Sequence, residues 1–115
     1  MGALDLGLGI DAGGTRTRWA LADLAGTIVA EGGVGGMSAL QMASDAGRDA
    51  VRGILTLLSA QALAAGRPVA VCAGLTGFDG SAALPAQWLA ELLGVAPAAV
   101  TVRNDIEIAY LDSFA

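Results

Sequence analysis

Hydrophobic and polar residues alternate at the start of the chain. In residues 4–11, LDLGLGID, leucine or isoleucine stands at every even position, with aspartate or glycine between them. A period of two predicts a β-strand. Residues 15–22 and 27–31 predict two further strands, joined by a hairpin turn at residues 23–26. Because such short links join antiparallel neighbours, we expect a three-stranded meander whose second strand runs antiparallel to the other two.

The middle of the chain changes to a helical period. The glycine-rich run 32–36 is expected to interrupt the strand pattern. Ser38 and Gln41 have the spacing of a capping box, which indicates a helix start, and position 44 or 45 offers a second one. Gly66 is a suitable end. The apolar stripe that predicts the helix consists of Val51, Leu55, Leu58 and Ala62, with Ile54 and Leu57 alongside.

The last part alternates between strands and helices. Residues 69–75 form a continuous apolar run, typical of a strand buried on both faces. A loop at 76–81, a helix at 84–93, a strand at 100–103 and a helix from 105 to 114 follow. The order β-β-β-α-β-α-β-α predicts an α/β fold with a five-stranded mixed sheet flanked by helices. The final helix reaches the end of the chain, so we expect residues 1–115 to be one domain of a longer protein.

The composition argues against several classes of protein, namely membrane-spanning, secreted and nucleic-acid-binding ones. The chain is 55% hydrophobic with a net charge of −5, and its longest uncharged run, residues 53–66, is shorter than the about 20 residues of a spanning helix. There is no basic segment before an apolar one, so no signal peptide is expected. All six basic residues are scattered arginines, outnumbered by eleven acids, which argues against nucleic acid as a partner. Cys72 is expected to be a core residue of a cytoplasmic protein.

The first candidate site follows the first strand. It reads Asp11-Ala12-Gly13-Gly14-Thr15-Arg16-Thr17. Small residues let backbone N–H groups approach a phosphate, and successive N–H groups form an anion-binding nest. Asp11 suits Mg²⁺, which prefers one or two carboxylates plus phosphate oxygens, and both threonines can donate hydroxyl hydrogen bonds. The same residues would also make an ordinary hairpin, with glycines for positive φ and a solvated aspartate.

The second candidate site follows the fifth strand, at Arg103-Asn104-Asp105. Open α/β sheets bind ligands beyond the carboxyl ends of their strands. There Asp105 could accept a proton from a substrate hydroxyl, or it could simply cap the next helix, since aspartate is a favoured N-cap. The expected topology places Asp11 and Asp105 at the ends of strands in one sheet, and this joint arrangement favours a site.

Together these features resemble the sugar kinase/Hsp70/actin superfamily and its RNase H-like, actin-like ATPase lobe. Residues 11–15 resemble the first phosphate motif, D-x-G-G/S-T. Within the superfamily the chain is most similar to the BadF/BadG/BcrA/BcrD ATPase family, which contains N-acetylglucosamine kinases. The resemblance covers nearly the whole chain. It rests on residues 11–17, Gly35-Gly36-Met37-Ser38, Ala73-Gly74-Leu75-Thr76-Gly77 and Asn104-Asp105.

The resemblance implies the N-terminal lobe of a two-lobed cytoplasmic enzyme that uses ATP and Mg²⁺ on a sugar, with the C-terminal lobe as a partner and no membrane. A homodimer is compatible with it. Gly13, Gly14, Thr15 and Thr17 would face the phosphates, and Asp11 the Mg²⁺. Asp105 would be the catalytic base, and Asn104, Thr76 and Gly77 would contact the substrate. One departure is that family kinases carry a sugar-binding Asn just after the glycine-rich stretch, where this chain has Ala39 or Leu40.

Two other functions stay open at this point. The same family contains ATPase activators of radical dehydratases and reductases, which hold an iron–sulfur cluster through cysteines. An actin-like scaffold that binds nucleotide without being an enzyme is the third interpretation. It would need no sugar base, so Asn104-Asp105 argues against it. The kinase interpretation is the one we favour.

Overall fold

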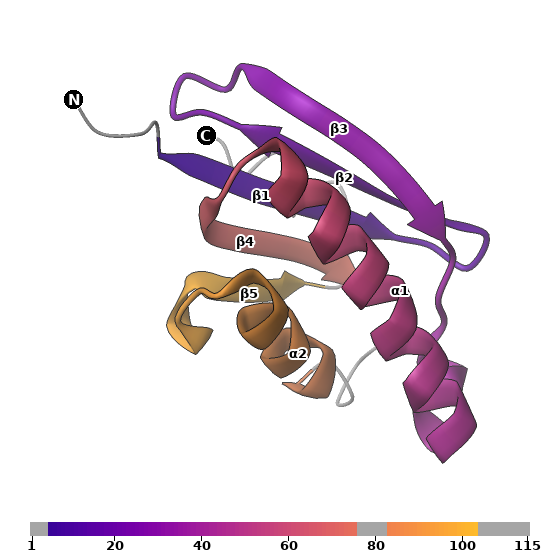
Figure 1. Ribbon diagram of the computed structural model, residues 1–115. Helices are drawn as coiled ribbons and strands as arrows, with labels where there is room; N and C mark the ends of the chain where they lie inside the picture. Colours follow the sequence, from indigo (N-terminus) through magenta and orange to yellow (C-terminus); the bar gives the residue numbers. More distant parts are fainter. Residues whose placement is uncertain (1–4, 76–82, 104–115) are drawn as a thin grey trace.

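The computed structural model describes residues 5–75 and 83–103 (Figure 1). Within these ranges the five expected strands and two expected helices are present. The expected loop at 76–81 and the expected third helix at 105–114 lie outside the described residues. Four predicted site residues also lie outside them: Thr76, Gly77, Asn104 and Asp105.

The five strands form one mixed sheet in the order β3-β2-β1-β4-β5. Their bounds are β1 Leu6–Ala12, β2 Arg16–Ala22, β3 Ile28–Gly35, β4 Pro68–Leu75 and β5 Val100–Arg103. β2 pairs antiparallel with β1 and β3, whereas β4 is parallel to both β1 and β5. The predicted meander and mixed sheet are therefore confirmed.

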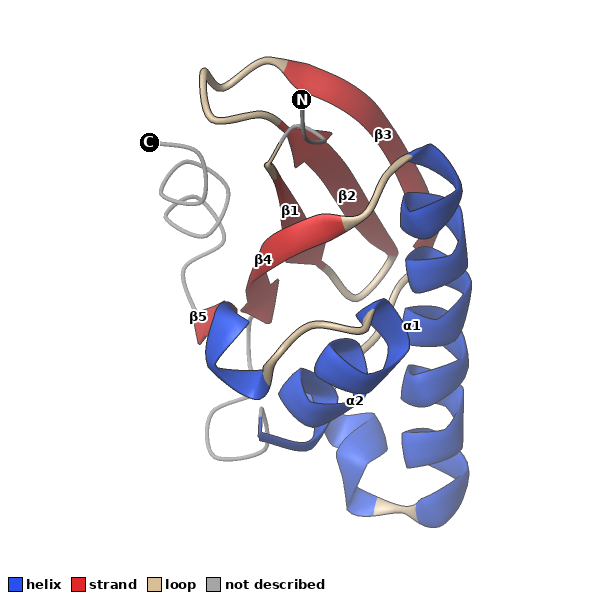
Figure 2. Cartoon of the chain, turned by 60° about the vertical axis from the view of Figure 1, so that its left-hand side comes forward, coloured by secondary structure: helices blue, strands red, loops and turns tan. Residues whose placement is uncertain are grey.

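Both helix starts that the sequence offers are used. Ser38 and Gln41 form a complete capping box that opens the short 3₁₀ helix η1 (Ala39–Ala43). Ser44 then caps the long helix α1 (Asp45–Ala65), since its Oγ accepts a hydrogen bond from the Gly47 N–H at 3.0 Å. Helix α2 (Ala83–Leu93) and the 3₁₀ turn η2 (Pro97–Ala99) precede β5. Helices α1 and α2 lie on one face of the sheet (Figure 2).

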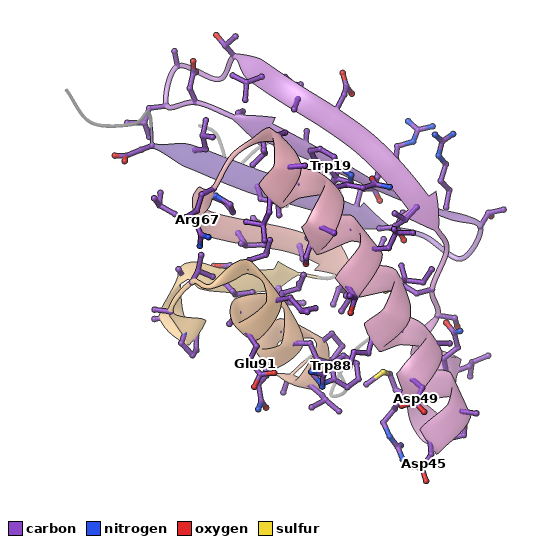
Figure 3. The ribbon with its side chains drawn as sticks, in the orientation of Figure 1. Trp19, Asp45, Asp49, Arg67, Trp88 and Glu91 are labelled. Carbon is purple, nitrogen blue, oxygen red and sulfur yellow. The ribbon has the colours of Figure 1, made fainter. Side chains whose placement is uncertain are left out.

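The core lies between that face and the two helices. The even positions of β1, the predicted α1 stripe and the inner side of α2 meet there. The indole N–H of Trp19 donates to Gln61 Oε1 of α1 at 2.8 Å, so this large side chain is both packed and satisfied (Figure 3). Fully buried side chains include Leu8, Ile10, Leu21, Val51, Leu55, Leu58, Leu75, Leu89 and Leu93. Cys72 is buried in β4, as expected.

The expectation that the glycine run would interrupt the third strand was wrong, because β3 continues to Gly35. The reason is a contact from the neighbouring strand. Gly32 pairs with Trp19, and a Cβ on Gly32 would lie 2.7 Å from the indole Nε1. Here glycine makes room for a large side chain while the backbone stays extended.

Candidate functional site

The strand register brings the ends of β1, β4 and β5, which precede the predicted site segments in the sequence, to one edge of the sheet. Asp11 pairs with Gly74 of β4, and Gly74 pairs with Arg103 of β5, so these residues lie level across three parallel strands. Ala12 pairs with Leu75, the last residue of β4. The carboxyl ends of parallel strands are the usual place for a ligand in an open α/β sheet. Residues 13–17, 76–77 and 104–105 all follow these strand ends along the chain.

The turn after β1 is closed by its first glycine. The Gly13 N–H donates to Arg16 O at 3.0 Å, and Gly13 O accepts from the Met37 N–H at 2.9 Å. Both polar backbone groups of Gly13 are therefore already used. Gly14 and Thr15 are exposed, and no backbone partner within residues 5–75 and 83–103 accepts from their N–H groups. These two N–H groups are the ones left to bind an anion.

Gly14 has no steric reason within the described chain to be glycine. A Cβ built on it meets no atom within 4 Å. Its φ is also outside the left-handed range, since the described glycines with positive φ are Gly26 and Gly94. The hairpin interpretation, in which the glycines serve positive φ, is therefore not what this turn displays. A bare backbone at an exposed turn is what the close approach of a ligand would require.

A charged hollow of about 320 Å³ adjoins the turn. Asp11 pairs with Arg18, which pairs with Gly33, so their side-chain positions share one face of the sheet. The Arg16 guanidinium lies over Gly33, where an added Cβ would be 3.1 Å from Nε. The hollow is lined by Asp11, Arg16, Arg18, Trp19, Glu31, Gly32 and Gly33.

Sequence reasoning missed Arg18 and Glu31 as neighbours of Asp11. The signal that could have found Arg18 is the period of two, which places it on the Asp11 face, as an expected cross-strand neighbour. Neither Arg16 nor Arg18 forms an ion pair with another residue of the described ranges. Their positive charge is thus available to an anion bound beside Asp11.

Thr17 lies on the opposite face of β2. Its side chain is 0% exposed, and its Oγ1 has no hydrogen-bond partner in the described structure. It pairs with Ala12 and Val34, under the turn and within the helix-covered core. Of the two threonines predicted to donate to phosphates, Thr15 is at the surface and Thr17 is enclosed.

Asp11 is a partly exposed carboxylate, and the described residues contain no group of three or more His, Cys, Asp or Glu side chains that could hold a metal together. This donor set fits Mg²⁺, which usually keeps several waters and takes one or two carboxylates plus phosphate oxygens. The Asp11 carboxylate is therefore suited to a metal that arrives with a phosphate ligand.

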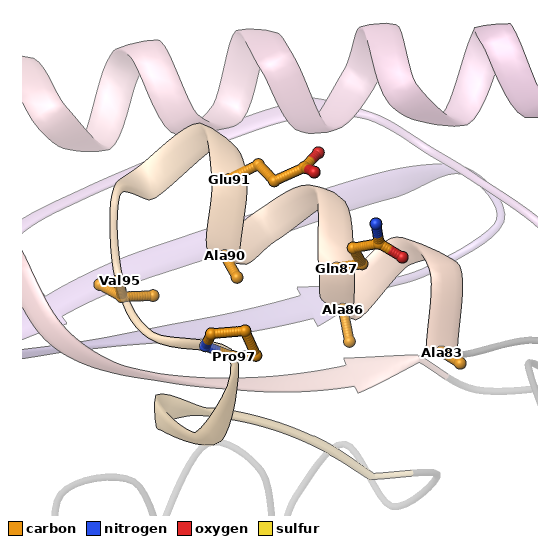
Figure 4. Close-up of a pocket in the computed structure, with 7 residues that line it drawn as sticks. All are labelled: Ala83, Ala86, Gln87, Ala90, Glu91, Val95 and Pro97. Atoms are coloured by element: carbon orange, nitrogen blue, oxygen red, sulfur yellow. The ribbon is translucent and has the colours of Figure 1, made fainter.

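A second hollow, of about 530 Å³, lies along α2 (Figure 4). None of the sequence-predicted site residues that the structure describes lines it. Its walls are Ala83, Ala86, Gln87, Ala90, Glu91, Val95 and Pro97. Nearby, Arg52 of α1 lies over the Trp88 ring at 5.6 Å and 4.0 Å from a Glu91 carboxylate oxygen, which ties α1 to α2 (Figure 3). We assign the Arg52 contacts to packing between the two helices, whereas the described walls of the hollow come from α2 and residues 95–97.

Comparison with solved structures finds a relative that is described as a kinase. No protein-family model matches the chain, and no curated protein matches it. A crystal structure from Chromobacterium violaceum, named "Putative N-acetylglucosamine Kinase", matches with 28% sequence identity and a TM-score of 0.50. The match covers 87% of this chain and 35% of that protein. The chain has the fold of an actin-like ATPase lobe.

The chain spans about a third of the length of the Chromobacterium violaceum protein. Its likeness to that protein is in both fold and sequence. Among the helices that the structure describes, none is long and apolar enough to cross a membrane.

Proposed function

We propose that the protein containing this chain transfers a phosphoryl group from MgATP to a hydroxyl of a sugar, an amino sugar such as N-acetylglucosamine in particular. The observation that carries the proposal is the turn at Gly13–Thr15, which lies beside Asp11 at the carboxyl ends of the parallel strands. The N–H groups of its exposed residues Gly14 and Thr15 have no hydrogen-bond partner among the described residues. The 28% identity with the Chromobacterium violaceum protein supports it. Within this proposal the chain is the N-terminal lobe of a cytoplasmic enzyme of the BadF/BadG/BcrA/BcrD ATPase family.

Each residue of the turn receives a separate role in the proposal. Gly14 and Thr15 donate N–H groups to the phosphates, and Gly13 closes the turn. Asp11 holds Mg²⁺, directly or through water, and this ion offsets the charge of the phosphates when it is bound. Thr17, expected from the sequence to contact the phosphates, has no role in this proposal because its side chain is 0% exposed on the opposite face of β2 from Asp11.

Asp105 is proposed as the residue that accepts the proton of the sugar hydroxyl. As that proton moves to the carboxylate, the oxygen forms its bond to the γ-phosphorus and the bond to ADP breaks. Phosphoryl transfer needs positioning and charge neutralisation more than covalent chemistry from the protein. Asn104, Thr76 and Gly77 are proposed to position the sugar, because they follow strand ends level with Asp11.

The alternative of a cluster-holding ATPase activator has less support. Such a protein needs cysteines at its surface. The lone cysteine of this chain is 8% exposed and lies within β4. A scaffold without catalysis would leave Asp105 without a chemical use, so the kinase function accounts for more of the chain.

Asp105→Asn in the full-length protein tests the proposed base. Asn caps a helix about as well as Asp, so a purely structural role predicts a stability change of only about a few tenths of a kcal/mol and unchanged turnover. A base predicts a fall in kcat of about 10²–10⁴-fold with ATP binding retained. Turnover at saturating sugar, measured together with a melting curve, distinguishes the structural role from the catalytic one. A stable variant with normal turnover would eliminate Asp105 as the base.

Asp11→Asn in the same protein tests the metal site. The amide keeps the shape of the carboxylate but removes the charge that a hydrated Mg²⁺ needs. We expect a higher Mg²⁺ concentration for half-maximal rate and a sugar KM that stays the same. The rate as a function of Mg²⁺ at fixed ATP provides the measurement. If the metal dependence is unchanged, Asp11 is only a turn residue.

A further inference from the structure

Two glycine-rich segments that are distant in sequence meet at the turn after β1. A Cβ built on Gly36 would lie 2.2 Å from Gly14 O, 2.4 Å from Gly14 C and 2.7 Å from Thr15 C. The next residue, Met37, donates its N–H to Gly13 O at 2.9 Å. The backbone at 36–37 therefore supports the turn through one close contact and one hydrogen bond.

This support is itself anchored on both sides. Before it, Val34 is 8% exposed at the end of β3 and belongs to the hydrophobic core. After it, Met37 is 3% exposed, and the Ser38 N–H donates to Gln41 Oε1 at 2.7 Å in the capping box of η1. Because its flanks are packed or capped, the 36–37 backbone cannot move away from the turn without disturbing them.

We propose that Gly36 is a positioning residue for the phosphate-binding turn. Its missing side chain lets the 36–37 backbone hold the Gly14–Thr15 peptide in the place where phosphates are bound. The inference rests on the proposed function, because it assumes that this turn binds the phosphates of ATP.

The expected displacement follows from the overlap. Non-bonded heavy atoms settle near 3.5–4.0 Å, so a Cβ at 2.2 Å from Gly14 O displaces the turn by on the order of 1 Å. The three atoms that this Cβ would meet, Gly14 O, Gly14 C and Thr15 C, all belong to the backbone. No flexible side chain can therefore move aside to relieve the overlap. A misplacement of about 1 Å in a reacting geometry can lower the rate by about 100-fold.

The test compares Gly36→Ala with Gly47→Ala in the full-length protein. A Cβ on Gly47 would lie 2.0 Å from Gln41 O, an equally severe backbone overlap at the start of α1. Both variants are expected to melt at lower temperature than the unsubstituted protein. Below both melting temperatures, only Gly36→Ala is expected to raise the Kd for MgATP, by about tenfold or more, with a loss of kcat. The amide NMR signals of Gly14 and Thr15 should shift in Gly36→Ala alone.

The possible failures are distinguishable. If the unsubstituted protein binds no MgATP, the proposed function and this inference both fall. If it binds MgATP and Gly36→Ala has the same Kd, or a rise equal to that of Gly47→Ala, only the inference falls. Should Gly36→Ala not fold, hydrogen exchange in the unsubstituted protein decides. MgATP is then expected to slow exchange of the Met37 amide more than that of Arg48, which donates to Ser44 O, and equal slowing overturns the inference.

Discussion

Gly14 and Thr17 follow Asp11 by three and six positions, yet the structure gives them opposite surroundings. A Cβ on Gly14 would point into open space, with no atom of the described chain within 4 Å. Thr17 is enclosed, with a hydroxyl that lacks a partner in the described structure. At the scale of the residue, this region thus contains a glycine that no neighbouring atom requires and a buried hydroxyl without a hydrogen-bond partner in the described structure. Each makes a specific test possible.

Gly14→Ala is expected to separate folding from ligand binding. The alanine fits without overlap and restricts the unfolded chain, so stability should be unchanged or rise by about 0.4–1 kcal/mol. Its methyl group would occupy the space that a phosphate needs. Loss of one hydrogen bond to a charged group is worth about 1.5–3 kcal/mol, so the Kd for MgATP should rise by about 10- to 100-fold. Calorimetric titration with MgATP, alongside a melting curve, provides the measurement. Unchanged affinity would remove Gly14 from the site.

Thr17→Val is expected to raise the stability of the protein. A buried hydroxyl without a partner costs about 1–3 kcal/mol, and valine removes that hydroxyl while keeping a similar shape. We expect the free energy of unfolding to rise by about 1 kcal/mol, and MgATP affinity to stay the same because the side chain is 0% exposed. Denaturant titration and MgATP binding test the two parts separately. Weaker MgATP binding would instead favour Thr17 as a phosphate contact.

At the scale of the element, β3 and α1 use glycine in different ways. Gly32 of β3 lies against the Trp19 ring of β2. Because Gly32 has no side chain, β3 can pass this large ring and remain a continuous strand. Gly53 of α1 is exposed, and an added Cβ there meets nothing within 4 Å. The first glycine is required by packing, whereas the second only weakens the helix.

Gly32→Ala is expected to destabilise the protein by about 1–3 kcal/mol, because the new methyl group forces the Trp19 ring out of its place. The displaced indole would also lose its hydrogen bond to Gln61. Gly53→Ala serves as the matched control and should raise stability by about 0.5–1 kcal/mol. Melting temperatures of the two variants should therefore move in opposite directions. A neutral Gly32→Ala variant would contradict the packing that explains why β3 continues through the glycines.

At the scale of the whole molecule, the sheet topology decides where a site can lie. The order β3-β2-β1-β4-β5 places three parallel strands beside one another, and their carboxyl ends share one edge. The Asp11 turn lies at that edge, and the two helices that the structure describes cover one face of the sheet (Figure 2). The chain spans 35% of the Chromobacterium violaceum protein, so the proposed enzyme needs a large further part.

The 115-residue chain alone is therefore expected to have no measurable kinase turnover. Half of a two-lobed site cannot hold adenosine or exclude water, and the advantage of positioning the reactants is lost. Release of ADP in the presence of N-acetylglucosamine should be assayed for this chain and for the full-length protein at equal concentration. Full turnover by the short chain would contradict the two-lobe proposal.

Much of the fold follows from local patterns. The alternation in residues 4–11 and the helical stripe from Val51 to Ala62 predict β1 and α1, because each period matches the geometry of one element. The short links predict the antiparallel meander. The capping residues Ser38 and Ser44 mark two possible starts of one helix, and the structure uses both, the first for η1 and the second for α1. The sequence also places Asp11 at the end of its strand, where a phosphate-binding turn can follow.

The contacts that organise the candidate site could not be predicted in this way. The Gly13 N–H is taken up by Arg16, and Gly36 lies against Gly14, although 22 positions separate these two glycines. The continuation of β3 likewise depends on a Trp19 ring that comes from another strand. Hydrophobic periodicity indicates the type of an element and which of its faces is buried on average. Which two backbones touch is decided only when the sheet and helices pack, because such contacts join residues far apart in the chain.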